Sequence, residues 1–227
     1  MLRQVGTTEG TLITANYQTA GRGQRSNAWQ SEAGKNILCT YILKPTWMAV
    51  DRQFALNKAV ALAVQRTIQS FCVQKSVWIK WPNDVLVNDS KVAGILIENT
   101  VSGGQIVSSL AGIGMNVNQQ QISIDGKKVI SIADVLKHSV SLDALQDELS
   151  AQLEAVYLRL RNGNDKPIAQ EFSEVLYKRD VVCVFETREG LRNYTVRGVS
   201  EQGQLMVEDE AGVRYQFNHG EVHLILE

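Results

Sequence analysis

Two kinds of hydrophobic pattern alternate along most of this chain. Short runs of β-branched and apolar residues, typical of strands, occupy residues 11–15, 36–43, 77–80, 85–87, 91–97 and 105–118. Apolar side chains recur at helical spacing in residues 51–71, 143–160 and 167–177. The three runs at 77–80, 85–87 and 91–97 are joined by two short turns, Trp81-Pro82-Asn83-Asp84 and Asn88-Asp89-Ser90, so we predict a β-meander in a sheet with helices covering one face.

The pattern changes from Val181 onward. Short alternating runs are separated there by Glu189-Gly190, Gln202-Gly203 and Ala211-Gly212, which is typical of a small antiparallel barrel. We therefore predict an α+β protein with a domain boundary near Arg179, giving domains 1–178 and 179–227.

Composition indicates an ordinary globular protein. The 227 residues are 44% apolar and 21% charged, and the net charge of −1 argues against a broad nucleic-acid or membrane footprint. Cys39, Cys72 and Cys183 lie far apart among apolar neighbours, which favours reduced thiols and a cytoplasmic protein. No secretory leader opens the sequence, and no apolar run approaches the roughly 20 residues of a membrane helix.

The candidate chemistry centres on residues 17–29, which read YQTAGRGQRSNAW. Glycine lets the backbone approach a ligand closely, and arginine offers donors that match phosphate or carboxylate, so we predict a loop that binds an anion. The pattern is neither a Walker A loop nor a dinucleotide-binding fingerprint. Further polar residues gather at predicted strand ends and turns, where they can converge on a cleft. The three histidines form no convincing metal or catalytic arrangement.

With these motifs in view, the chain resembles the biotin protein ligases, which join biotin to a lysine of biotin-dependent carboxylases. The resemblance rests on four motifs in the family's order, and the predicted barrel follows them as in that family. The motifs are YQTAGRGQRSNAW at 17–29, KWPND at 80–84, KVAGILIE at 91–98 and GIGMNVN at 112–118.

This resemblance implies a mixed β-sheet backed by helices, related to class II aminoacyl-tRNA synthetases, with a C-terminal SH3-like β-barrel. It also implies two steps: biotin and MgATP give biotinyl-5′-AMP, and a lysine of the biotin carboxyl carrier protein of acetyl-CoA carboxylase, or of a related carboxylase, then takes the biotinyl group. A loop that closes over the intermediate would limit its hydrolysis. The expected partners include no DNA and no membrane, and an exposed sheet edge could form a homodimer.

The resemblance also implies roles for individual residues. The catalytic residues would be Lys91 and Arg22, which meet the biotin carboxyl and phosphate charge, and Asp84, which lies near the incoming lysine. For Asp84 the alternative is a turn residue that caps its own backbone. Trp29 either walls the ligand site or packs in the core. The expected substrate- and nucleotide-binding residues are Gln18, Gly21, Arg22, Gly23, Gln24, Arg25, Trp29, Lys91, Gly94 and Asn116; no resident metal ligand is expected.

Two departures from the family pattern leave alternatives open. Gln24 stands where the family usually has a second loop arginine, although Arg25 is adjacent. The Ser/Thr-Thr-Asn segment that normally precedes the loop is absent, so the chain looks N-terminally short. The alternatives are a non-catalytic protein that binds biotin or the carrier protein, and a lipoate or octanoate ligase of the same fold.

Overall fold

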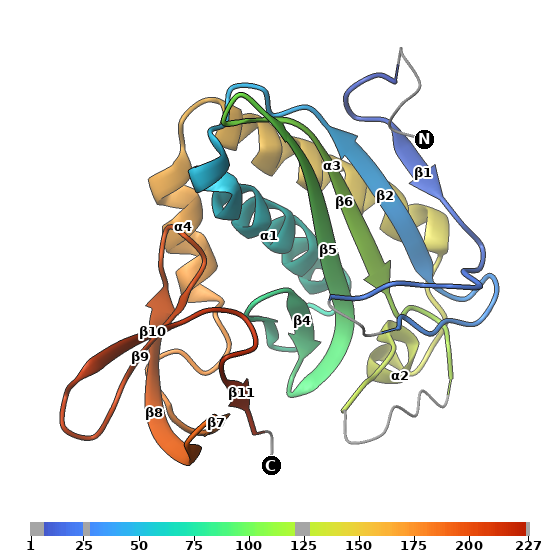
Figure 1. Cartoon of the computed structure of the whole chain (residues 1–227). Coiled ribbons are helices and arrows are strands. Elements are labelled where there is room, and N and C mark those ends of the chain that lie inside the picture. The colour runs from blue at the N-terminus through green and yellow to red at the C-terminus, as the bar shows by residue number, and fades with distance from the viewer. Residues whose placement is uncertain (1–6, 25–27, 121–127, 226–227) are drawn as a thin grey trace.

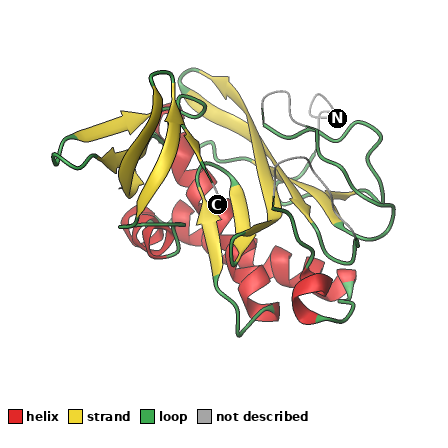
Figure 2. Cartoon of the chain, turned by 90° about the horizontal axis from the view of Figure 1, so that it is seen from below, coloured by secondary structure: helices red, strands yellow, loops and turns green. Residues whose placement is uncertain are grey.

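The computed structural model describes residues 7–24, 28–120 and 128–225, and they form the predicted α+β architecture. A six-stranded sheet has the strand order β1-β2-β6-β5-β4-β3. Its helices gather on one side, as Figures 1 and 2 show. The strands are β1 (Leu12–Thr14), β2 (Ile37–Leu43), β3 (Val77–Lys80), β4 (Asp84–Val87), β5 (Ser90–Ser102) and β6 (Gln105–Met115).

The predicted β-meander is confirmed by the pairing of β3 with β4 and of β4 with β5. Every ladder between its described strands is antiparallel. Parallel pairing is limited to isolated bridges such as Ile79–Leu176 and Lys91–Val129. A mixed sheet was predicted, and parallel pairing is present only in these isolated bridges. The ladders are antiparallel because each central strand reaches the next through a short reversing turn.

The helix predicted at residues 51–71 is α1 (Gln53–Phe71), preceded by a 3-10 turn at Val50–Arg52. Its many small and branched apolar residues are almost completely buried, and it packs against α3 (Leu142–Arg161). The Ser141 side chain caps α3 by accepting a hydrogen bond from the Ala144 amide at 3.3 Å. Among the described residues, no helix is long and apolar enough to cross a membrane.

The helix predicted at residues 167–177 is α4 (Asp165–Glu174), so its predicted end is wrong. The segment after Glu174 leaves the helix because its backbone pairs with β3: the Ile79 amide donates to Val175, and the Tyr177 amide donates to Ile79, both at 2.8 Å. A short helix that the sequence analysis missed, α2 (Ile132–Leu136), begins at a Ser131–Asp134 capping box.

The C-terminal residues form a five-stranded antiparallel sheet of order β10-β9-β8-β7-β11, consistent with an SH3-like domain. No ladder joins β10 to β11 among the described residues, so the hydrogen bonding does not close the predicted barrel. The strands are β7 (Val182–Thr187), β8 (Gly190–Val199), β9 (Leu205–Glu208), β10 (Arg214–Phe217) and β11 (His223–Leu224).

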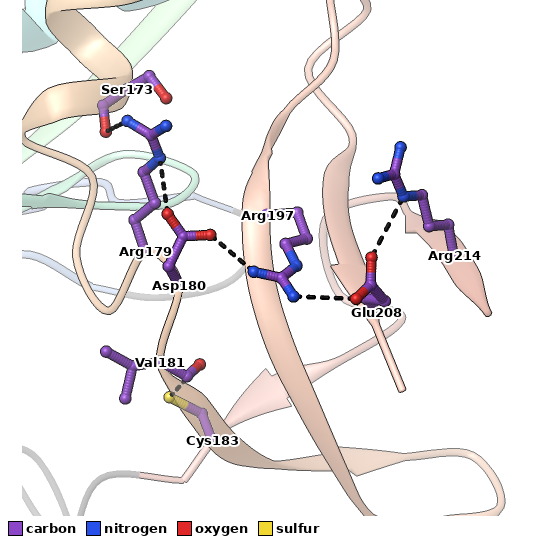
Figure 3. Close-up of polar contacts among 8 residues, drawn as sticks. All are labelled: Ser173, Arg179, Asp180, Val181, Cys183, Arg197, Glu208 and Arg214. Atoms are coloured by element: carbon purple, nitrogen blue, oxygen red, sulfur yellow. Dashed lines mark hydrogen bonds and ion pairs between the residues drawn. The ribbon is translucent and has the colours of Figure 1, made fainter. Parts of the chain in front are cut away.

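A line of charged side chains crosses the junction between α4 and this small sheet (Figure 3). Arg179 donates to the Ser173 carbonyl at 3.3 Å and lies 3.4 Å from the Asp180 carboxylate. Arg197 bridges Asp180 and Glu208 at 2.9 Å each. We propose the domain boundary at residues 178–179, supported by the change from α4 to β7 around this junction.

Candidate functional site

A cavity of about 840 Å³ lies over β5 and β6 of the large sheet and extends to the small sheet. Its walls come from residues 18–24 and 28–30 of the glycine-rich loop, the turn before β4, the strands β5 and β6, and the inner face of the small sheet. This volume lies within the range of about 300–1,000 Å³ that is common for small-molecule sites.

The glycine-rich loop is held at its base by a close backbone approach. The Trp29 amide donates to the Gly21 carbonyl at 2.9 Å, and Arg22 pairs with Ala28 in an antiparallel bridge. A Cβ atom on Gly21 would lie 2.4 Å from the Trp29 carbonyl oxygen, so this approach requires glycine. The loop thereby brings Gln18, Arg22, Gly23 and Gln24 to the cavity. Gly21 lines a second, smaller pocket instead, and Arg25 falls outside the described residues.

Two opposed glycines form part of the cavity floor. Gly94 on β5 pairs directly with Gly114 on β6, so this part of the sheet face carries no side chains. The Trp29 indole occupies the space: a Cβ atom on Gly114 would lie 2.5 Å from Trp29 Cε2, and one on Gly94 would lie 3.1 Å from Trp29 Cζ3. Trp29 thus lies within the cavity wall, over a flat strip of backbone.

Lys91 and Asp84 form an ion pair beside this strip, with 2.6 Å between Lys91 Nζ and Asp84 Oδ1. The Lys91 ammonium also lies 5.6 Å from the centroid of the Trp29 ring, within cation–π range. Lys91 lies at the start of β5, and because β5 lies between β4 and β6 this position is inside the sheet rather than at its edge. Its amide also binds the Lys128 carbonyl at 2.8 Å, so its backbone is fixed on more than one side.

Arg22 is also paired, with a carboxylate that the sequence analysis did not select. Its guanidinium donates to Glu98 Oε2 at 2.9 Å, and the two side chains are 71% and 46% exposed. Glu98 lies on the same face of β5 as Gly94, since alternate residues of a strand share a face. This spacing within KVAGILIE is the signal that could have identified it.

Asn116 lies just beyond the end of β6, where it lines the cavity and is 3% exposed. Its backbone N–H donates to the Val92 carbonyl at 2.8 Å, and its backbone carbonyl accepts from the Ile132 amide at 3.0 Å. The loop also holds three buried polar atoms without hydrogen-bond partners among the described residues, Gln24 Oε1, Trp29 Nε1 and Ser31 Oγ. Buried polar atoms normally have partners, so these atoms are candidates for ligand contacts.

Together these features suit a ligand that has both a flat ring and an anionic group. Lys91 and Arg22 supply positive charge, and the glycine strip and Trp29 supply flat contact surface. Of the residues that the structure describes, no three His, Cys, Asp or Glu side chains cluster closely enough to hold a metal ion.

Comparisons with known proteins agree with this site. Residues 2–116 match the model of the biotin/lipoate A/B protein ligase family. A bifunctional ligase/repressor BirA of Bacillus spizizenii is 42% identical over 113 residues, which cover 49% of this chain and only about a third (34%) of the relative. A biotin–[acetyl-CoA-carboxylase] ligase of Paracoccus denitrificans is 27% identical over 205 residues, covering 88% of this chain and 85% of the relative.

The fold agrees with a solved structure as well. A biotin protein ligase from Aquifex aeolicus, determined in complex with biotin and ATP, superimposes with a TM-score of 0.81 at 21% identity, covering 98% of this chain and 92% of that one. The family model spans half of the chain, including the glycine loop, the ion pair and both floor glycines. The chain belongs to the biotin/lipoate A/B protein ligase family.

Proposed function

We propose that this protein is a biotin protein ligase, which activates biotin with ATP to biotinyl-5′-AMP and transfers biotin to one lysine of a biotin carboxyl carrier protein. The observation that carries the proposal is the cavity in which Lys91 and Arg22 lie around the strip formed by Gly94 and Gly114 under Trp29. The family membership and the names of the relatives support the same chemistry.

In the first step, a biotin carboxylate oxygen attacks the α-phosphorus of ATP, and pyrophosphate leaves. Negative charge accumulates where these groups meet, and fixed cations lower the barrier. Lys91 and Arg22 would supply this charge once they turn from Asp84 and Glu98, with which they pair in the structure. Mg²⁺ would enter as part of the MgATP substrate and offset phosphate charge, and Asp84 and Glu98, the acidic residues among the described lining of the cavity, would be the side chains to add a ligand.

In the second step, the amine of the carrier lysine attacks the biotinyl carbonyl carbon, the bond to phosphate breaks, and AMP leaves. The amine must first lose a proton, because the ordinary lysine pKa is about 10.4. Asp84 becomes available for this proton when Lys91 turns to the adenylate. The same carboxylate thus pairs with Lys91 before the first step and accepts the proton of the amine in the second.

The remaining predicted binding residues fit around these groups. Gln18, Gly23, Gln24, Gly94 and Asn116 line the cavity and would contact biotin or the nucleotide, and Gly21 would set the loop's shape. The three free cysteines support a cytoplasmic location, where thiols stay reduced.

The test is to mix purified protein with biotin, MgATP and a biotin carboxyl carrier domain, and to follow the carrier by mass spectrometry. We expect a mass gain of one biotinyl group, absent when the acceptor lysine of the carrier is replaced by arginine. Lipoate in place of biotin tests the lipoate-ligase alternative. Binding of biotin without any mass gain, while a known ligase works on the same carrier, would support a non-catalytic binding protein instead.

A further inference from the structure

The turn between β8 and β9 of the small sheet docks against α1 of the large domain. Gly203 in this turn has a φ of +89°, and a Cβ atom there would lie 2.3 Å from Cδ2 of Phe54 on α1. The turn is also closed internally, since the Gly203 amide donates to Ser200 at 3.2 Å. The backbone of the turn at Gly203 therefore lies against an aromatic ring of the other domain.

Lys58, one helical turn after Phe54, binds the same turn. Its ammonium donates to the Ser200 carbonyl at 3.2 Å and lies 5.5 Å from the centroid of the Phe54 ring. The residue is only 7% exposed, and burial lowers the pKa of its ammonium, while Glu201 on the turn opposes that change. A buried lysine that binds one carbonyl is a specific contact rather than a solvated charge.

Trp81 links this docked turn to the cavity. Its indole Nε1–H donates to the Gly203 carbonyl at 2.8 Å, and its ring meets His219 edge to face, with 5.9 Å between the centroids. Trp81 is thereby held by two separate segments of the small sheet. Its own backbone belongs to the turn that leads into β4.

The far end of that turn is fixed to the large sheet. Asn83 Nδ2 donates to the Ile95 carbonyl at 2.9 Å, and the Ile95 amide donates to the Asn83 carbonyl at 3.0 Å. Asp84 follows immediately and reaches Lys91. The short turn that leads to Asp84 is thus anchored by Ile95 at one end and, through Trp81, by Gly203 at the other.

We propose that Trp81 is a positioning residue for biotinyl transfer: its hydrogen bond to Gly203 couples docking of the small domain to the placement of the Asp84 carboxylate. This inference rests on the proposed function. It assigns to the small domain a defined contribution to the second step, made through Trp81 rather than by direct contact with the reacting atoms.

The test is Trp81→Phe, which keeps an aromatic ring but removes the N–H donor. Transfer from pre-formed biotinyl-adenylate should slow about fivefold to tenfold, as expected for one lost hydrogen bond that leaves a carbonyl unpartnered. Biotin-dependent pyrophosphate release should stay within twofold of the wild-type rate. Trp47→Phe is the matched control, because Trp47 packs on Tyr157, away from the cavity, and should change neither rate.

A double-mutant cycle separates positioning from a general effect on structure. If Trp81 acts through Asp84, Trp81→Phe should cause no further slowing of transfer in an Asp84→Asn background. Lys58→Met, which removes the bond to Ser200, should also slow transfer more than pyrophosphate release, and it serves if Trp81→Phe folds poorly. Additive effects, or transfer by Trp81→Phe within twofold of wild type, would overturn the inference; a wild-type protein that transfers no biotin would instead contradict the proposed function.

Discussion

The ammonium nitrogen of Lys91 lies 2.6 Å from a carboxylate oxygen of Asp84, and the two residues come from adjacent antiparallel strands. Both side chains are about three-quarters buried, with 27% and 24% exposed. Water solvates a largely buried charge poorly, and in this pair each charge is compensated by the other. In the proposed reaction the pair separates in the first step, when Lys91 turns to the adenylate, and the released Asp84 is then available for the second step.

Lys91→Ala should abolish adenylate formation and leave the fold intact. Removing a fixed cation from a developing charge costs about 3–4 kcal/mol, or roughly a hundredfold to a thousandfold in rate. The measurement is biotin-dependent pyrophosphate release, with circular dichroism to check folding. Lys75→Ala, at an exposed turn, is the control and should behave as wild type. A Lys91→Ala rate within threefold of wild type would mean that the site is misplaced.

Gly114→Ala should weaken biotin binding more than Gly94→Ala. At Gly114 the new Cβ would lie 2.5 Å from Trp29 Cε2, so the indole must move; at Gly94 the nearest atoms lie 3.1 Å or more away and include the flexible end of Lys91. We expect roughly a tenfold loss of affinity or more for Gly114→Ala, about 1.4 kcal/mol. Isothermal titration calorimetry measures both variants, and equal losses would argue against Trp29 as part of the biotin site.

Glu98→Gln should strengthen binding of the adenylate while hardly changing stability. The Arg22–Glu98 pair is exposed, and such pairs contribute about 0–1 kcal/mol, so its loss costs little. Arg22 would no longer have to leave the Glu98 carboxylate before it binds the adenylate phosphate. We therefore expect up to about fivefold tighter binding of a non-hydrolysable adenylate analogue. Glu189→Gln removes a comparable exposed pair with Arg192 and should leave affinity unchanged. Weaker binding by Glu98→Gln would show that Glu98 itself supports the ligand.

Sequence patterns predicted most of the secondary structure here because strands and helices are encoded locally. The end of α4 was not predictable in this way, since Val175 and Tyr177 leave the helix to pair with Ile79, a residue far away in the chain. The site shows the same division. The motifs singled out Lys91, Asp84 and Arg22, which line one cavity, but the pairing of Arg22 with Glu98 and the contact of Trp81 with Gly203 depend on how distant segments meet.

Two of the three thiols, those of Cys39 and Cys183, should differ in reactivity. Burial raises the pKa of Cys39 to about 12, so the fraction of thiolate at pH 8 is only on the order of 1 in 10,000. Burial also raises the pKa of Cys183, but this residue is half-buried rather than fully buried. Iodoacetamide at pH 8 should therefore modify Cys183 first and Cys39 only after unfolding, as followed by peptide mass spectrometry. Early modification of Cys39 would contradict the packing of β2.

Stability should depend on pH through Glu171, which joins α4 to α1 and α3. Hydrogen bonds from Arg159, with a further contribution from Arg66, hold the pKa of Glu171 below its usual value of 4.5. A carboxylate whose pKa is lowered on folding stabilises the protein above its unfolded pKa, and this stabilisation is lost as the pH falls through the folded value.

Glu171→Gln should accordingly lower the melting temperature at pH 7 by about 2–4 °C, corresponding to roughly 1 kcal/mol for a partly exposed ion pair. The difference from wild type should shrink as the pH falls below about 4.5 and vanish once the wild-type carboxylate is protonated. Scanning calorimetry across this range is the measurement. A difference that is independent of pH would mean that packing of the side chain, rather than its charge, is responsible.

The cavity draws its walls from Gln18 near one end of the chain and from Leu224 near the other. Contacts between such distant segments form late, because closing a long loop costs entropy before the contacts themselves can stabilise it. Refolding should therefore restore helical circular dichroism before it restores biotin binding. A ligand added during refolding would report the last event of assembly, the meeting of the two sheets, rather than the formation of either one.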